Sequence, residues 1–191
     1  MNRYGIDHLN NVIRSIGSLL FPPVCVYCGA ERPNDDSVAC LECSRSILPV
    51  ERPFCALCGR PAPGLNSGIN RFCGKCSSHR PSFDKARFCV YYSSVVRRGI
   101  LQFKFNSSLY LGEALLGLLS KTFEEHFLSE NLDAIIPIPV HKKRLLHRGY
   151  NQCAVLAGKL GARFGIHFHT DVFLMTSNTV SITQLKKNLK K

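Results

Sequence analysis

Eight of the ten cysteines in this 191-residue chain form four CxxC pairs, and this pattern constrains the fold more than any other feature. The pairs are Cys25/Cys28, Cys40/Cys43, Cys55/Cys58 and Cys73/Cys76. Two thiolates three positions apart on a tight turn can both reach one zinc ion at about 2.3 Å, and a second pair completes a tetrahedral site. Gly29 and Gly59 each follow a pair, where glycine lets the backbone turn its amides towards the sulfurs. The pattern therefore predicts zinc knuckles with one or two structural ions.

A disulfide framework is the main alternative to zinc. It would need an oxidising compartment, and the first 20 residues contain no short apolar run that ends in a small-residue cleavage site. A catalytic zinc is disfavoured because eight thiolates saturate two ions and leave no open position. The pairing stays open: consecutive pairs would form two ribbons, and alternate pairs a cross-braced module. The gaps between the pairs are 11, 11 and 14 residues, and consecutive pairing is favoured because about 11 residues suffice for a short ribbon hairpin.

The chain is strongly basic, with 25 Lys and Arg against 13 Asp and Glu and a formal net charge of +12. Two zinc ions on eight thiolates would lower this to about +8. A positive balance of this size predicts an anionic partner such as nucleic acid or phosphates. No apolar run approaches the roughly 18 residues that span a bilayer. We therefore expect no integral membrane segment and a cytoplasmic protein.

Three parts are expected along the chain. Residues 1–20 have apolar residues at helical spacing, which predicts an N-terminal amphipathic helix. Residues 21–80 contain all four CxxC pairs and end in a stretch rich in Pro, Gly, Asn and Ser, so they are expected to form a double zinc ribbon. Residues 81–191 are expected to form a second domain.

The second domain has an alternating pattern. Strands are predicted at 83–94, 132–140 and 166–174, and helices at 95–105, 111–128 and 150–165. The strand at 132–140 is apolar apart from Asp133, which predicts burial on both faces. This order indicates an α/β domain with a mainly parallel sheet.

The stretch IIPIPVHKKRLLHRGYNQ, residues 135–152, gives the strongest indication of a ligand. In an open α/β sheet, ligands bind beyond the carboxyl ends of the strands, where we expect this segment to form a basic loop. The next helix would add free amides and the positive end of its dipole. The predicted phosphate-binding residues are Lys142, Lys143, Arg144, Arg148 and Asn151. The alternative is a basic surface loop without a ligand.

The segments LFPPVCVYCG, FCALCGRPAPG, FCGKC and IIPIPVHKKRLLHRGYNQ resemble the ComF family. The last of them is close to the family pattern PVPLHxKRxxxRGxNQ, and Lys104 in LQFKF resembles the family's lysine–aromatic step. The resemblance covers most of residues 20–165. It implies a double zinc ribbon followed by a type I phosphoribosyltransferase-like domain, with phosphoribosyl pyrophosphate and Mg²⁺ as ligands. In this family the segment 139–144 would face the pyrophosphate. It also implies a role in natural competence, the handling of incoming single-stranded DNA in the bacterial cytoplasm.

The sequence departs from that family at its C-terminal end. A type I site also needs a strand that ends in paired acids and a Thr-Gly-rich loop that cradles the 5′-phosphate. Here Asp171 is the only acidic residue after Asp133, and no glycine follows Gly165. We therefore expect an incomplete type I sheet, truncated at the C-terminus, and a chain that is catalytically impaired as given. The alternative is a non-enzymatic zinc-ribbon module that binds single-stranded nucleic acid or a protein partner of the competence machinery.

Overall fold

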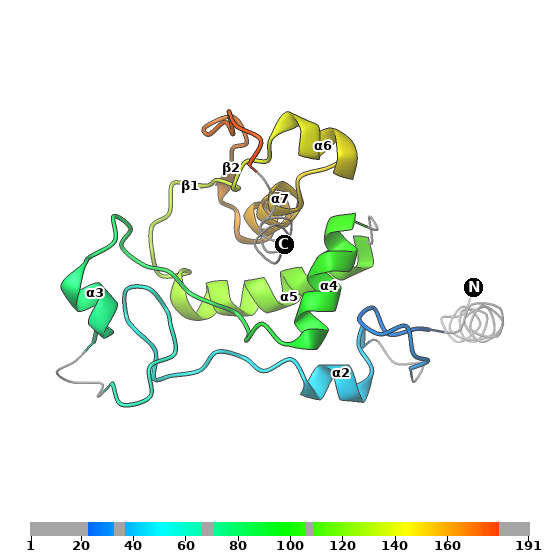
Figure 1. Ribbon diagram of the computed structural model, residues 1–191, viewed down its shortest axis with the longest axis horizontal. Helices are drawn as coiled ribbons and strands as arrows, with labels where there is room; N and C mark the ends of the chain where they lie inside the picture. The colour runs from blue at the N-terminus through cyan, green and yellow to red at the C-terminus, as the bar shows by residue number, and fades with distance from the viewer. Residues whose placement is uncertain (1–22, 33–36, 66–70, 106–108, 180–191) are drawn as a thin grey trace, which may run out of the picture. The chain divides into compact units, whose positions relative to one another are not determined.

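The computed structural model describes residues 23–32, 37–65, 71–105 and 109–179 (Figure 1). The chain divides into two compact units, Met1–Leu101 and Gln102–Lys191. The predicted N-terminal helix at 1–20 and the C-terminal lysines lie outside the described residues. The predicted domain boundary near residue 80 stays a prediction. None of the helices in the described ranges is long and apolar enough to cross a bilayer.

The first unit contains the same small motif twice. In the first copy, the Cys25 amide donates to the Ala30 carbonyl over 2.8 Å and the Gly29 amide to the Cys25 carbonyl over 2.8 Å. In the second, Cys55 donates to Arg60 and Gly59 to Cys55, both over 2.9 Å. Gly29 and Gly59 have φ values of 77° and 70°, in the left-handed region that favours glycine. Both glycines therefore do what the sequence predicts of a zinc knuckle.

Each knuckle is followed by a short helix that begins at a CxxC pair. These helices are α2, Leu41–Arg45, and α3, Gly74–Ser78 (Figure 1). Cys40 and Cys73 are their N-cap residues, so Cys43 and Cys76 stand at the third helical position and are buried. A CxxC pair across a helix start thus directs both thiols to the same side.

The predicted strand at 83–94 is wrong. This segment forms one isolated bridge, between Val90 and Pro49, flanked by hydrogen bonds from Val50 to Cys89 and from Tyr91 to Leu48. The pairing does not extend beyond this bridge, so the segment has no regular strand. The segment instead joins the two ribbon copies to the start of α4, Ser94–Phe105.

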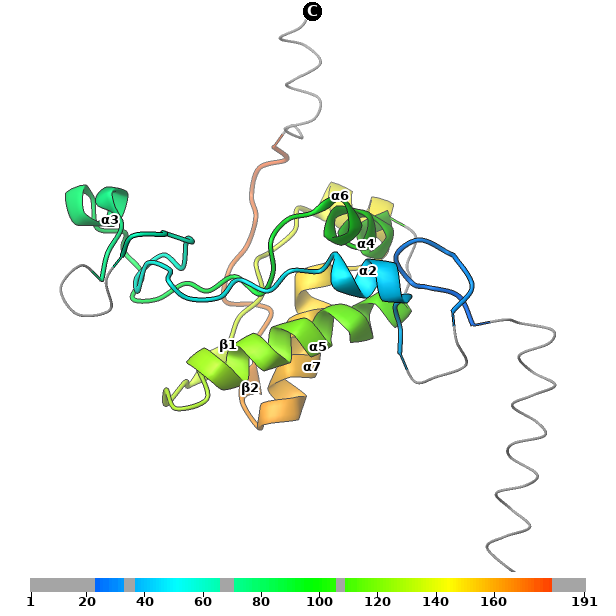
Figure 2. The same ribbon diagram turned by 90° about the horizontal axis from the view of Figure 1, so that it is seen from below.

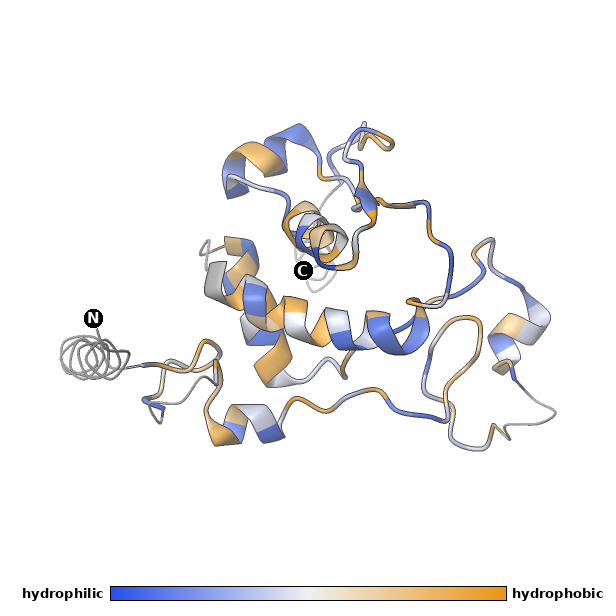
Figure 3. Cartoon of the chain, turned by 180° about the vertical axis from the view of Figure 1, so that it is seen from behind, coloured by the Kyte–Doolittle hydropathy of each residue, from blue (hydrophilic) through white to orange (hydrophobic). Residues whose placement is uncertain are grey.

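The helices predicted at 95–105, 111–128 and 150–165 are confirmed. They are α4, α5 (Leu109–His126) and α7 (Gln152–Phe164). Hydrophobic and hydrophilic residues alternate along α5 (Figure 3). Its buried Leu116 and Phe123 pack with Leu160 of α7, and the rings of Phe123 and Phe164 are 4.7 Å apart. Figure 2 shows α5 and α7 side by side, and this contact forms the core of the second unit.

The described part of the sheet is one parallel pair of short strands. β1, Ala134–Ile135, pairs with β2, His167–Phe168, and α7 connects them. Two glycines of α7 lie against this pair: a Cβ on Gly158 would come 3.3 Å from the Phe168 ring, and one on Gly161 2.8 Å from the Ile166 carbonyl oxygen. Small residues on α7 therefore permit its close approach to the strands.

The prediction of a strand over 132–140, buried on both faces, is wrong in its extent and its burial. Only two residues are in β1, and the side chains of Ile136 and Ile138 are 39% and 70% exposed. Pro137 and Pro139 lack amide hydrogens, and β2 is the only neighbour of β1 within the described residues. The described fold is therefore mixed, mainly helical with few strands, and the full phosphoribosyltransferase-like sheet stays a prediction.

Candidate metal centres and basic segment

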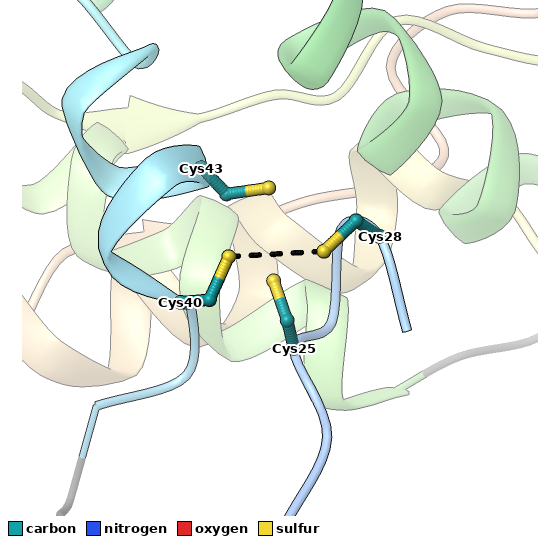
Figure 4. Close-up of side chains that lie close together, drawn as sticks. All are labelled: Cys25, Cys28, Cys40 and Cys43. Atoms are coloured by element: carbon teal, nitrogen blue, oxygen red, sulfur yellow. Dashed lines mark hydrogen bonds between the residues drawn. The ribbon is translucent and has the colours of Figure 1, made fainter. Parts of the chain in front are cut away.

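The first ribbon copy brings four sulfur atoms together. They belong to Cys25, Cys28, Cys40 and Cys43, and all lie within 4.8 Å of one another. Figure 4 shows the four side chains pointing into one common space, two from the knuckle and two from α2. The Sγ atoms of Cys28 and Cys40 are 3.7 Å apart.

The second copy repeats the arrangement with Cys55, Cys58, Cys73 and Cys76, again within 4.8 Å of one another. Here the Sγ atoms of Cys58 and Cys73 are 3.8 Å apart. Consecutive pairs are thus grouped, as the short gaps between them predicted.

These distances fit a tetrahedral zinc–thiolate site. With a zinc–sulfur distance of about 2.3 Å, tetrahedral geometry places two sulfurs about 3.8 Å apart. A disulfide would require about 2.0 Å, and all ten cysteines are free. Both groups of four therefore have the donor type, number and spacing of structural zinc sites, and each ion would have a complete set of ligands.

Backbone amides lower the pKa of the first cysteine in each group. Burial alone would raise the pKa of Cys25, but donation from the amides of Cys40, Tyr27 and Cys28 outweighs it and lowers that pKa to about 6. In the second copy burial would likewise raise the pKa of Cys55. Donation from the amides of Cys58, Cys73 and Leu57 outweighs this effect and lowers that pKa to about 6. The Cys73 amide lies 3.3 Å from the Cys55 sulfur. The knuckle backbone thus favours the thiolate form of these two cysteines, which is the form that binds metal.

The last cysteine of each group has the opposite environment. Burial first, and then the neighbouring thiols, raise the pKa of Cys76 to about 12 and also raise that of Cys43. Four closely spaced thiolates repel one another, and a bound dication removes that repulsion. The donor sets therefore favour a divalent cation.

The second knuckle is held by a segment that follows it. The Ala86 amide donates to the Leu57 carbonyl over 2.7 Å, and a Cβ on Gly59 would come 2.4 Å from the Ala86 carbonyl oxygen. Arg87 donates to the Ala56 carbonyl over 3.0 Å. At Gly29, the equivalent position in the first knuckle, a Cβ would meet nothing within 4 Å. The two copies therefore differ in their outer support.

The basic segment after β1 is a helix, which corrects the predicted loop. α6 comprises Lys142–Arg148, between the N-cap residue His141 and Gly149, whose φ is 78°. The Lys143 amide donates to His141 Nδ1 over 3.3 Å, and the Gly149 amide to the Leu145 carbonyl over 2.8 Å. Lys, Arg and Leu are strong helix formers, so capping at both ends suffices for two turns.

The structure disperses the five predicted phosphate-binding residues. Lys142 and Asn151 line a cavity of about 570 Å³. Lys143 is exposed on α6 and is not among the residues that line that cavity. Arg144 donates to the Thr179 carbonyl and hydroxyl. Arg148 lies 5.1 Å from the centre of the Phe105 ring and donates to Gln152 Oε1 over 3.4 Å.

Asn151 has a defined structural role. Its Oδ1 accepts from the amides of Cys153 and Ala154, over 3.0 and 3.4 Å, and its Nδ2 donates to the Ile138 carbonyl over 3.0 Å. The amides at the start of α7 that were expected to be free are therefore capped. Phosphate binding by these five residues stays a prediction.

Sequence reasoning missed the other wall of the cavity. It includes Thr170, Phe173, Leu174, Met175 and Thr176, which follow β2. The apolar run VFLM was the available signal, and it was assigned to a strand. It missed His141 as a cap as well, although a polar side chain immediately before KKRLL is a helix-start signal.

Residues 16–77 match the double zinc ribbon domain family. The chain is 27% identical over 139 residues to Competence protein F of Haemophilus influenzae, and this alignment covers 71% of this chain and 58% of that protein. It is 23% identical over 151 residues to Competence protein ComFC of Bacillus subtilis, with 70% and 60% covered. The DNA utilization protein YhgH of Shigella flexneri is 25% identical over 176 residues, with 91% and 75% covered. These matches support the resemblance to the ComF family. The ComF-like chain spans about three fifths of the length of the first two relatives. No solved structure matches it.

The second sulfur group predicts the zinc content of a single variant. Cys58→Ser should lower bound zinc from two ions to about one per chain, because three thiolates no longer complete the tetrahedron. The second ribbon copy should become sensitive to protease while α5 and α7 stay folded. Cys153→Ser is the matched control, since Cys153 is exposed and belongs to neither group. Metal analysis after gel filtration measures the outcome, and two ions retained in Cys58→Ser would contradict the assignment.

The two knuckle glycines predict a difference between otherwise identical substitutions. Gly29→Ala should destabilise the ribbon by about 1–2 kcal/mol, the usual cost of left-handed backbone in a residue with a Cβ. Gly59→Ala should destabilise it more, because the new Cβ would also overlap the Ala86 carbonyl. The temperature at which zinc is released to a chromogenic chelator measures both. Equal decreases in that temperature for the two variants would contradict the contact between Ala86 and the second knuckle.

Proposed function

We propose that this ComF-like protein acts in the uptake or use of DNA during natural competence, and that its second unit binds a phosphorylated sugar ligand beyond β1 and β2. The names of three relatives, two competence proteins and a DNA utilization protein, support the first part. The observation that carries the second is the cavity of about 570 Å³, whose lining includes residues 139–142, Thr170 and residues 173–176.

The position of this cavity follows from the strand pair. β1 and β2 are parallel and end at Ile135 and Phe168, so the segments that leave them start from the same edge. Ligands of open α/β proteins bind beyond this edge. Lys142 supplies a positive charge at the cavity wall, and His141 and Asn151 supply polar atoms there.

The resemblance to the ComF family suggests phosphoribosyl pyrophosphate with Mg²⁺ as the ligand. Lys142, on the first turn of α6, would meet the pyrophosphate, while the exposed Lys143 would raise the local positive potential. Val140, Leu145 and Phe173 make the rest of the wall apolar, which suits the sugar ring or a base better than a second phosphate.

For this 191-residue chain we propose binding without turnover. Paired acids hold the ribose hydroxyls in type I phosphoribosyltransferases, and Asp171 is the only acidic residue after Asp133. Asp171 is exposed and is not among the cavity-lining residues. The chain as given therefore lacks the carboxylate pair that would orient the substrate for catalysis.

Lys142→Ala should weaken binding of phosphoribosyl pyrophosphate with Mg²⁺ about tenfold, because a charged hydrogen bond to phosphate contributes roughly 1.5 kcal/mol. Lys121→Ala, which removes an exposed lysine from α5, should leave the affinity unchanged. Isothermal titration calorimetry measures both, and a parallel assay should detect no pyrophosphate release. Equal affinity in the two variants, or no binding by the parent, would overturn the ligand assignment.

The first unit favours a second candidate function, binding of single-stranded DNA. Residues 45–98 contain ten Lys and Arg against two Asp and Glu. Five aromatic side chains in this range are exposed: Phe72, Phe83, Phe88, Tyr91 and Tyr92. Cationic surroundings attract the phosphates, and exposed rings stack on unpaired bases without regard to sequence.

This candidate predicts salt-dependent affinity for a single-stranded oligonucleotide. The logarithm of the binding constant should fall linearly with the logarithm of salt concentration, with a slope of about −0.7 for each phosphate contacted. Fluorescence anisotropy with a labelled oligonucleotide measures it, and phosphoribosyl pyrophosphate should not compete. A parent protein that fails to bind, or whose affinity ignores salt, would contradict this function.

A further inference from the structure

The second ribbon copy has a groove that neither the metal centres nor the cavity of the second unit uses. Its volume is about 440 Å³, and four prolines line it together with Leu48, Glu51, Arg52 and Tyr91. All these residues belong to the first unit. The groove therefore combines rigid apolar rings, one aromatic side chain and one charge of each sign.

Backbone pairing holds the walls in place. Pro49 forms a bridge with Val90, and the Tyr91 amide donates to the Leu48 carbonyl over 2.9 Å. On the other wall, Pro61 forms a bridge with Phe54. Proline rings have few conformations to lose, so a ligand that enters this groove pays little ordering entropy.

Positive charge lies beside the groove. The guanidinium carbon of Arg52 is 5.8 Å from the centre of the Phe54 ring, and that of Arg87 is 5.0 Å from it. Arg52 is exposed and also lines the groove. Stacking on the ring restricts a guanidinium while its edge can still meet a phosphate.

The tyrosine offers a flat apolar surface. Tyr91 is 46% exposed and lines the groove, whereas its neighbour Tyr92 is 68% exposed and does not. Glu51 would repel a phosphate in the groove, but its carboxylate can accept a hydrogen bond from an N–H group of a base, such as N3–H of thymine. Together these features favour a base inside the groove and its phosphate outside, towards Arg52.

We propose that this groove seats one unpaired base of single-stranded DNA, stacked on Tyr91, with a flanking phosphate at Arg52. The inference rests on the single-strand-binding function proposed above and assigns that function a specific site. The ten-to-two charge balance of residues 45–98 matches an anionic chain. A duplex does not fit, because its bases are already paired and stacked and cannot enter without unstacking.

Two adjacent tyrosines provide the test and its control. Tyr91→Ala should weaken binding of an oligothymidylate about tenfold and leave the salt slope unchanged, because it removes stacking and no charge. Tyr92→Ala should change the affinity for the oligothymidylate less than twofold, and Tyr91→Phe should retain the affinity of the parent protein. Arg52→Ala should make the salt slope shallower by about 0.7. Bound zinc in each variant reports whether the ribbon is intact.

Photocrosslinking of the parent protein gives a readout that needs no variant. An oligonucleotide carrying 5-iodouracil should form its main adduct on Tyr91. If the parent binds single strands but Tyr91→Ala and Tyr92→Ala behave alike, or the adduct forms elsewhere, the groove assignment is wrong and single-strand binding stands. If the parent binds no single-stranded DNA, both fail. If the duplex binds as tightly as the single strand, the base-in-groove geometry is wrong.

Discussion

The two clusters of four thiolates are the constraint on which the first unit depends. In the ribbon copies, the buried apolar side chains are mostly the cysteines themselves, with Tyr27 and Leu57 beside them. So small a core contributes little hydrophobic free energy relative to the backbone entropy lost on folding. A metal ion that binds four thiolates in the folded ribbon and few in the unfolded chain supplies the missing stabilisation. Those sulfur positions determine how the knuckles are arranged with α2 and α3, and the groove lies beside them.

The second unit is stabilised differently. Leu116, Phe123 and Leu160 form an ordinary apolar core, and glycines on α7 let the helix approach β1 and β2 closely. That packing also determines what the basic segment can do. Asn151 caps α7, Arg148 lies against Phe105, and Arg144 contacts Thr179, so these residues stabilise the local fold. A residue type that suits phosphate binding also suits capping and stacking, and only the three-dimensional partners distinguish the two uses.

The two surfaces proposed to bind anionic ligands differ in form. One is a cavity beyond the parallel strands, with a lysine in a largely apolar wall. The other is a cationic ribbon with exposed rings. The first suits a compact phosphorylated molecule and the second an extended polymer, because a polymer gains from many screened contacts and a small ligand from a few convergent ones.

Much of this organisation is present in the sequence itself. The two CxxC pairs that are each followed by a glycine determined the knuckles, and apolar periodicity located α4, α5 and α7, because both signals act over a few neighbouring residues. Tertiary structure decided the rest. It grouped consecutive cysteine pairs, reduced the predicted strand at 83–94 to one isolated bridge, shortened the strand at 132–140 where prolines interrupt pairing, and turned the basic segment into α6. It also joined prolines near residues 50 and 62 with Tyr91 into one groove. No local sequence pattern predicts that these residues lie together. Their contact depends on pairing between backbone groups that are far apart in the sequence, and this pairing forms only when the whole ribbon has folded around its sulfur atoms.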